Sequence, residues 1–250
     1  MVSYGIRFMN TAHTLLRDAL RADIMRLEGF RPQSWANHAD LGPLQETFPN
    51  GFPKGALHEF FASQPESLAA TLGFLSGLLS ITHKSGCILW VSANRKVFPP
   101  ALQAFGLDPG RIIFADLISE RQIPWAIEEA LKCTGITAVV GEMKALDFLT
   151  SRRFQLAAER TQLSGFFLRT GLVNKEPTAC VTRWNVEAMN SITIQDESGV
   201  LPGIGFPKWK VELLRMRNGS PNTWELQWSQ QQFIDASLQP EFIQQQVIAS

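Results

Sequence analysis

Short apolar runs alternate with longer runs of helical spacing between residues 55 and 190, and this alternation restricts the possible folds more than any other feature. The expected strands are residues 56–61, 87–92, 111–115, 137–140, 165–169 and 178–186, and the expected helices are 68–81, 119–132 and 145–162. Strands that are separated by helices pair in parallel, and an uninterrupted apolar run such as 88–91 suits a strand buried on both faces. The sequence therefore predicts an α/β fold, a mostly parallel sheet covered by helices on both faces.

Different patterns flank this core. Residues 11–28 carry apolar side chains at helical spacing, and the polar segment 31–53 has no periodicity, so we expect an N-terminal helix and tether over 1–54. The core is expected over 55–230 and ends in a β-hairpin, because Asn218-Gly219 favours the positive φ of a tight turn. The remaining tail, 231–250, is compatible with a weak helix, a frayed end or a docking segment.

The composition excludes several classes of protein. Acidic and basic residues number 23 each, so bulk charge does not favour coating of nucleic acid. Three separated cysteines predict reduced, buried thiols, and the four histidines lack ligand spacing, so no metal is expected. No secretory pattern or long apolar run is present, which predicts a cytoplasmic protein without a membrane segment. Six tryptophans are assigned to core and hairpin packing: Trp90, Trp125, Trp184, Trp209, Trp224 and Trp228.

Residues 60–71 lie where a phosphate-binding loop is expected, between an apolar strand and a helix. Such a loop needs glycines that let backbone N–H groups surround phosphate, a lysine at the helix start, and a Ser or Thr for Mg²⁺. No glycine lies between Gly55 and Gly73, and Ala70 precedes Thr71 at the lysine position. Tight nucleotide binding is therefore not expected, and no cofactor is predicted.

Several motifs resemble a known family. The segment 64–71, with Pro65, Glu66 and Ser67, resembles the Pro-Glu-Ser-Ser-Gly-Lys-Thr loop of RecA recombinase, in the same place between strand and helix. The closer resemblance is to ImuA, the RecA-like accessory protein of the inducible mutasome. It covers about residues 10–230 and rests on five segments, 52–59, 125–130, 151–159, 182–184 and 207–215.

The resemblance implies a RecA-like P-loop NTPase core that has lost its catalytic residues. The general-base position reads Asn94, which cannot take a proton from water. The metal-holding acidic position reads Gly141, and Glu142 would face the other side of the strand if the strand continues. The chain is thus predicted to be a pseudo-ATPase with degenerate Walker A and B positions, not an enzyme.

The family also implies a function, as a non-catalytic scaffold of DNA-damage-induced, error-prone translesion synthesis in the SOS response. Its expected partners are a Y-family-like inactive polymerase subunit and an error-prone DNA polymerase, with RecA, self-association and weak DNA binding left open. Candidate partner-binding residues are the apolar side chains of the two ends: Leu16, Leu20, Ile24, Phe233, Phe242 and Ile243. Candidate DNA contacts are Arg152, Arg153, Arg169, Lys208 and Lys210, which could equally form ion pairs or a solvated face.

Two alternatives belong to other classes. A SulA-like cell-division inhibitor would share the fold and bind the tubulin-like division protein, and a neighbouring gene for a Y-family-like protein would argue against it. An ATP-dependent DNA-binding recombinase or motor would need the chemistry that Ala70, Asn94 and Gly141 lack.

Overall fold

The computed structural model describes residues 39–62, 64–170, 176–191 and 205–237. All of them belong to the second of the two units into which the chain divides, residues 1–36 and 37–250. The strands are β1 (Leu57–Ala62), β2 (Cys87–Ser92), β3 (Ile112–Asp116), β4 (Ile136–Met143), β5 (Ser164–Thr170), β6 (Thr182–Met189), β7 (Lys208–Met216), β8 (Asn222–Ser229) and β9 (Gln232–Asp235). The α-helices are α2 (Pro65–Thr82), α3 (Ile123–Leu131) and α4 (Phe148–Thr161), and the 3₁₀ helices are η1 (Gly42–Leu44), η2 (Pro99–Phe105), η3 (Pro109–Arg111) and η4 (Glu120–Gln122).

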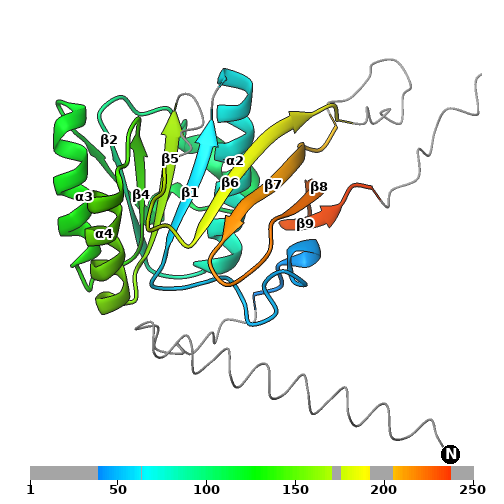
Figure 1. The fold of residues 1–250 in the computed structure, drawn as a ribbon. Coiled ribbons are helices and arrows are strands. Elements are labelled where there is room, and N and C mark those ends of the chain that lie inside the picture. The colour runs from blue at the N-terminus through cyan, green and yellow to red at the C-terminus, as the bar shows by residue number, and fades with distance from the viewer. Residues whose placement is uncertain (1–38, 63, 171–175, 192–204, 238–250) are drawn as a thin grey trace, which may run out of the picture. The chain divides into compact units, whose positions relative to one another are not determined.

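The described strands form one sheet in the order β3-β2-β4-β5-β1-β6-β7-β8-β9. Pairing is parallel from β3 to β6 and antiparallel from β6 to β9. The predicted α/β fold is therefore confirmed as a mixed sheet. The predicted hairpin, β7 and β8, is not an appendage but continues the parallel sheet through β6 (Figure 1).

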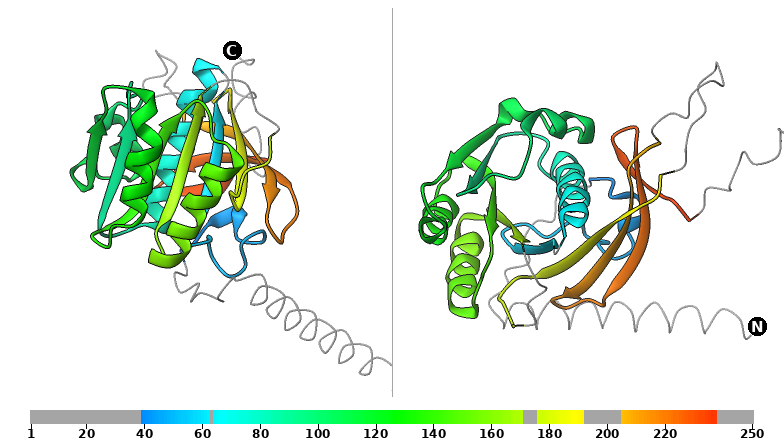
Figure 2. Two further views of the ribbon diagram at one scale, coloured as in Figure 1. Left: turned by 60° about the vertical axis from the view of Figure 1, so that its left-hand side comes forward. Right: turned by 90° about the horizontal axis from the view of Figure 1, so that it is seen from above.

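Helices cover the two faces of the sheet unequally. The sheet curves around α2, whereas α3 and α4 lie side by side on the outer face (Figure 2). Strand residues alternate between two apolar clusters, because successive side chains of a strand point to opposite faces. Phe60, Trp90 and Val140 pack on the α2 side, whereas Val91 and Val139 pack on the α3 and α4 side.

Close approach between α2 and the C-terminal strands depends on a glycine. A Cβ added at Gly77 would lie 2.8 Å from the Trp228 ring, so a larger residue would push β8 away from the helix. The same region of the core receives Phe233 from β9, whose ring centroid lies 5.0 Å from that of Trp228 and 5.1 Å from that of Phe74. Helix α2 and strands β7 to β9 are therefore parts of one core.

Both expected domain boundaries need correction. The segment 39–54 is not a tether where it is described, because it contributes apolar side chains to the core: Ala39, Leu41, Leu44, Phe48 and Phe52. At the other end, Gln232–Asp235 forms β9, so the expected tail does not begin at residue 231. Both segments lack a regular apolar spacing in the sequence, yet both bury apolar side chains in the core. Residues 238–250 of the tail, and the expected N-terminal helix, lie outside the described residues.

Two expectations about side-chain burial are also wrong in part. All three cysteines are free, but Cys87 and Cys133 are exposed and only Cys180 is buried. Trp125 is 68% exposed, whereas Trp90 and Trp184 are fully buried. None of the helices in the described ranges is long and apolar enough to cross a membrane.

Candidate functional site

The connection between β1 and α2, where phosphate would bind in an ATPase, is short. Residues 63 and 64 alone separate the two elements. Gln64 has an extended backbone and caps the helix: its N–H donates to Ser67 Oγ at 2.9 Å, and Ser67 Oγ donates to the Gln64 carbonyl at 2.8 Å. The hydroxyl of Ser67 is thus occupied in closing the first turn of α2, where helix ends otherwise leave backbone groups unpaired.

The residues at the positions predicted to bind nucleotide and metal in an ATPase are instead buried or hydrogen-bonded within α2. Ala70 is 5% exposed and belongs to the core on the α2 side. Thr71 is fully buried, and its Oγ1 donates to the Ser67 carbonyl at 2.6 Å, within the helix. Exposed Glu66 places a carboxylate in the first turn, where it interacts favourably with the helix dipole and would repel a phosphate. Pro65 is the first residue of α2, as its fixed φ favours.

Gly141 lies on the α3 side of β4, and its surroundings leave no room for an acidic side chain. A Cβ there would lie 2.4 Å from Ile127 Cδ1 and 3.4 Å from Phe167 Cδ1. Ile127 is itself fully buried, so it would have to move within a packed core. Asn94 lies exposed in the bend after β2. Gly141, which the sequence predicts to be the Walker B position, thus has neither a carboxylate nor the space for one.

Glu142 lies on the opposite, α2 side of β4, because the strand continues to Met143. Its Oε1 accepts from Trp90 Nε1 at 2.8 Å and its Oε2 accepts from the Lys96 N–H at 2.9 Å. Burial raises the pKa of this carboxyl, while these hydrogen bonds oppose the rise. The carboxylate therefore joins β4 to β2 and to the segment that follows β2. Nowhere in the described ranges do three or more potential metal ligands cluster.

A buried ion cluster joins β1, β5 and β6. Glu59, which is fully buried, has its Oε1 2.5 Å from Arg169 Nη1 and its Oε2 2.8 Å from Arg183 Nε. Thr178 Oγ1 donates to Glu59 Oε2 at 3.0 Å, and the Phe61 ring lies under both guanidinium groups. Arg169 is 4% exposed. Its assignment as a DNA contact is therefore wrong in this structure, because a buried carboxylate requires a cationic partner.

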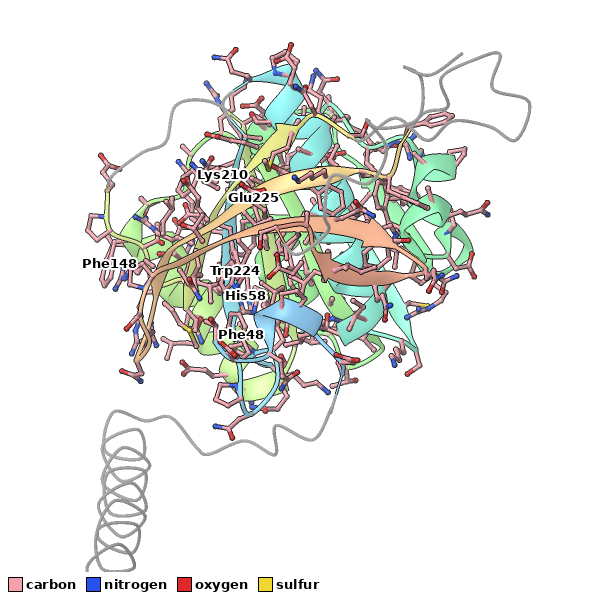
Figure 3. The ribbon with its side chains drawn as sticks, turned by 90° about the vertical axis from the view of Figure 1, so that its right-hand side faces the viewer. Phe48, His58, Phe148, Lys210, Trp224 and Glu225 are labelled. Atoms are coloured by element: carbon pink, nitrogen blue, oxygen red, sulfur yellow. The ribbon has the colours of Figure 1, made fainter. Side chains whose placement is uncertain are left out.

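The other four basic candidates lie in two separate places, exposed on α4 and half-buried on the hairpin. On α4, Arg152 and Arg153 are exposed, and Arg153 Nη2 lies 3.5 Å from Glu128 Oε2 of α3. On the hairpin, Lys208 Nζ lies 3.2 Å from Glu225 Oε2, and Lys210 Nζ lies 2.8 Å from Glu212 Oε1. Figure 3 shows Lys210 beside Glu225, the residue opposite it in the β7–β8 ladder. The hairpin face mixes both signs of charge and does not form a basic patch.

The partner-binding candidates are split by the structure. Phe233 is 3% exposed and packs in the core, so it offers no surface for a partner. The other five candidates lie outside the described residues: Leu16, Leu20, Ile24, Phe242 and Ile243.

Of the nucleotide-site candidates, the structure brings together those at the start of α2: Pro65, Glu66, Ser67, Ala70 and Thr71. Gly141 faces the other side of the sheet.

Sequence reasoning missed an exposed apolar group on α3 and α4. Trp125, Phe148, Leu149 and Leu156 are between 49% and 76% exposed. The buried residues of α4 are Ser151, Phe154, Gln155 and Ala158, which form one helical stripe. Leu149 and Leu156 lie outside this stripe and are seven residues apart, so they share another face of the helix. This second apolar stripe is the sequence signal from which the exposed apolar group could have been predicted.

The sheet order, with one helix inside its curve and two outside, defines the class of fold. The crystal structure of the RadB recombinase matches with a TM-score of 0.53 and 12% identity, over 81% of this chain and 98% of that one. At that identity the likeness concerns the fold alone, which is RecA-like. No family model matches the chain.

Sequence relatives identify the family within the RecA-like fold. Protein ImuA of two Caulobacter vibrioides strains, NA1000 / CB15N and ATCC 19089 / CIP 103742 / CB 15, is 31% identical over 194 residues, 72% of this chain and 78% of ImuA. The chain therefore belongs to the ImuA family. A weaker match is the cell division inhibitor SulA of Photorhabdus laumondii subsp. laumondii, 29% identical over 119 residues, 46% of this chain and 67% of SulA.

Proposed function

We propose that this protein is a pseudo-ATPase that serves as a non-catalytic accessory subunit of DNA-damage-induced, error-prone translesion synthesis. The observation that carries the proposal is the closed start of α2, where the Ser67 hydroxyl bonds to the backbone of the N-cap residue Gln64, and Ala70 and Thr71 are buried. Phosphoryl transfer needs charge neutralisation, metal and an oriented water, and these residues supply none of them. Membership of the ImuA family supplies the setting.

In this role the protein acts through contacts with other proteins. The partners that family membership suggests are a Y-family-like inactive polymerase subunit and an error-prone DNA polymerase in the cytoplasm, and RecA is a further candidate. DNA binding has less support, because Arg169 is buried and both hairpin lysines have carboxylate partners. The SulA match supports a second candidate, inhibition of the tubulin-like division protein, over less than half of the chain.

Reconstitution tests the proposal. The full chain is mixed with the Y-family-like subunit and the polymerase of the same organism, with and without Mg·ATP, and complexes are followed by analytical ultracentrifugation. The proposal predicts a complex that forms equally well without nucleotide. A complex that requires ATP, or none at all, would contradict it. Light scattering of the division protein, unchanged by an equimolar amount of this chain, would reject the second candidate.

A further inference from the structure

The outer side of α3 and α4 carries large apolar side chains that face water. We call it the α3–α4 surface and define it by Trp125, Phe148, Leu149, Arg152, Leu156 and Arg160. Trp125 is 68% exposed, Leu149 76% and Leu156 51%. Single exposed apolar residues are ordinary, but several on neighbouring helices mark a site that another molecule covers.

Helical geometry places these side chains near one another. The ion pair between Arg153 and Glu128 links α4 to α3 at 3.5 Å. Residues three or four positions apart share a helix face. One turn before the ion pair, α3 therefore carries Trp125 and α4 carries Leu149, and one turn after it α4 carries Leu156. The two helices run in the same direction, because each connects parallel strands.

Both charged residues that define the surface, Arg152 and Arg160, are positive. Arg152 and Arg160 are exposed, and neither forms an ion pair with any carboxylate of the described residues. Four acidic residues lie nearby on the two helices: Glu128 pairs with Arg153, Glu129 with Lys132, Asp147 accepts from Thr150 at the start of α4, and Glu159 accepts from Gln155 Nε2 at 2.9 Å. The exposed residues of α4 are thus apolar at 148, 149 and 156 and arginine at 152, 153 and 160, of which Arg153 is the one paired with Glu128.

We propose that the α3–α4 surface binds a helical segment of another protein, with apolar residues on one side flanked by Asp or Glu. An amphipathic helix laid along α4 would cover Leu149 and Leu156 and pair with Arg152 and Arg160. This inference deepens the proposed function, on which it rests, by specifying the chemistry of a partner.

Other occupants fit less well. A second copy that used the same surface would bring Arg152 and Arg160 of both chains together, because a two-fold interface is self-complementary. The chain's own segment 11–28 has three arginines and three acidic residues, so it offers no net negative charge. DNA would cover the arginines but would leave bulky apolar groups without a partner, since phosphate contacts dominate its binding.

The test is fluorescence anisotropy with a labelled helical peptide of about 20 residues, leucine on one face and glutamate beside it. The full chain is compared with the variants L149A/L156A and R152E/R160E. Matched controls are L214A, an exposed leucine of β7, and K84E, an exposed lysine beyond the end of α2. We expect saturable binding that each double variant weakens at least about tenfold and that each control changes less than about twofold.

Four results would overturn the inference: no binding, equal loss in the controls, equal affinity for a peptide with lysine in place of glutamate, or binding of single-stranded DNA that the double variants abolish. Sedimentation of the chain alone adds a fifth, since a dimer lost in the double variants would make a second copy the occupant. Failure here leaves nucleotide-independent assembly intact, because the reconstitution above tests that separately.

Discussion

Trp90 Nε1 donates to Glu142 Oε1 at 2.8 Å, joining the side chains of two neighbouring parallel strands. The same carboxylate accepts from the backbone of Lys96 and so fixes the start of the segment that leads to η2. This carboxylate lies one residue after Gly141, the position that the sequence predicts to correspond to the metal-holding acidic residue of a RecA-type ATPase. In this chain it stabilises the fold.

Glu142→Ala is expected to destabilise the protein by about 2–3 kcal/mol, because the indole N–H and the Lys96 N–H lose their acceptor. Urea denaturation followed by circular dichroism measures the change. Glu129→Ala, at a half-exposed glutamate of α3, should cost less than about 0.5 kcal/mol. Equal effects of the two substitutions would contradict the role of Glu142.

Gly141→Ala tests the packing that excludes an acidic side chain from β4. The added methyl group would lie 2.4 Å from Ile127 Cδ1, and overpacking of this kind costs about 1–3 kcal/mol. Ile127→Val removes that Cδ1 atom, so Gly141→Ala should cost less in the Ile127→Val background. A double-mutant cycle of unfolding free energies measures the difference. Strict additivity would show that Ile127 does not limit the site.

Arg169→Met and Arg152→Met form a matched pair at a buried and an exposed arginine. The first leaves Glu59 short of a cationic partner and should cost about 3–5 kcal/mol. The second changes a solvated side chain and should cost less than about 0.5 kcal/mol. Thermal unfolding of the purified variants measures both. An Arg169→Met protein as stable as the wild type would contradict the buried ion cluster.

His58 makes stability depend on pH. Its ring packs against those of Phe52 and Phe166, with Nε2 3.1 Å from the Pro53 carbonyl and Nδ1 2.8 Å from Thr182 Oγ1. Burial lowers its pKa from 6.5 to about 3. The folded protein thus keeps the ring neutral while the unfolded chain takes up a proton below pH 6.5. The stability is complete above pH 6.5 and falls by up to about 1.4 kcal/mol per pH unit as the pH drops toward 3.

His58→Phe removes that proton uptake and two hydrogen bonds. The variant should be less stable at pH 7, but its deficit should shrink between pH 6.5 and 4. Denaturant titrations across this range measure the deficit. A deficit that is constant with pH would show that His58 titrates alike in both states.

The sequence was sufficient for the five parallel strands β1 to β5 and the three α-helices, because apolar runs and helical spacing report burial directly, whereas β6 is displaced from the expected 178–186 and β9 was not predicted. The strand 87–92 was predicted with its observed bounds, and α2 differs only at its ends. Aperiodic segments were the difficult part. Phe48 and Phe52 lie in irregular chain whose apolar side chains fill the core beside Trp184, which no periodicity reveals.

The role of a candidate residue could be predicted where its own side chain decides the chemistry. It could not be predicted where the role depends on a contact with a residue distant in the sequence. Ala70 excludes a catalytic lysine whatever the fold, so it could be identified from the sequence. The burial of Arg169 depends on Glu59, which is 110 positions away in the chain and meets it only through adjacent strands. The exposure of Trp125 likewise depends on which stripe of α3 faces the sheet.

The most direct measurement for the central claim is an isothermal titration of the full chain with Mg·ATP up to millimolar concentration. The account predicts no saturable heat, because the start of α2 is closed by Ser67 and no cation is available at position 70. Ala70→Lys should not restore binding, since the side chain at that position is buried in the core, and it should lower thermal stability. Saturable binding of Mg·ATP by the wild-type chain at micromolar concentration would contradict the claim that the nucleotide site has been lost.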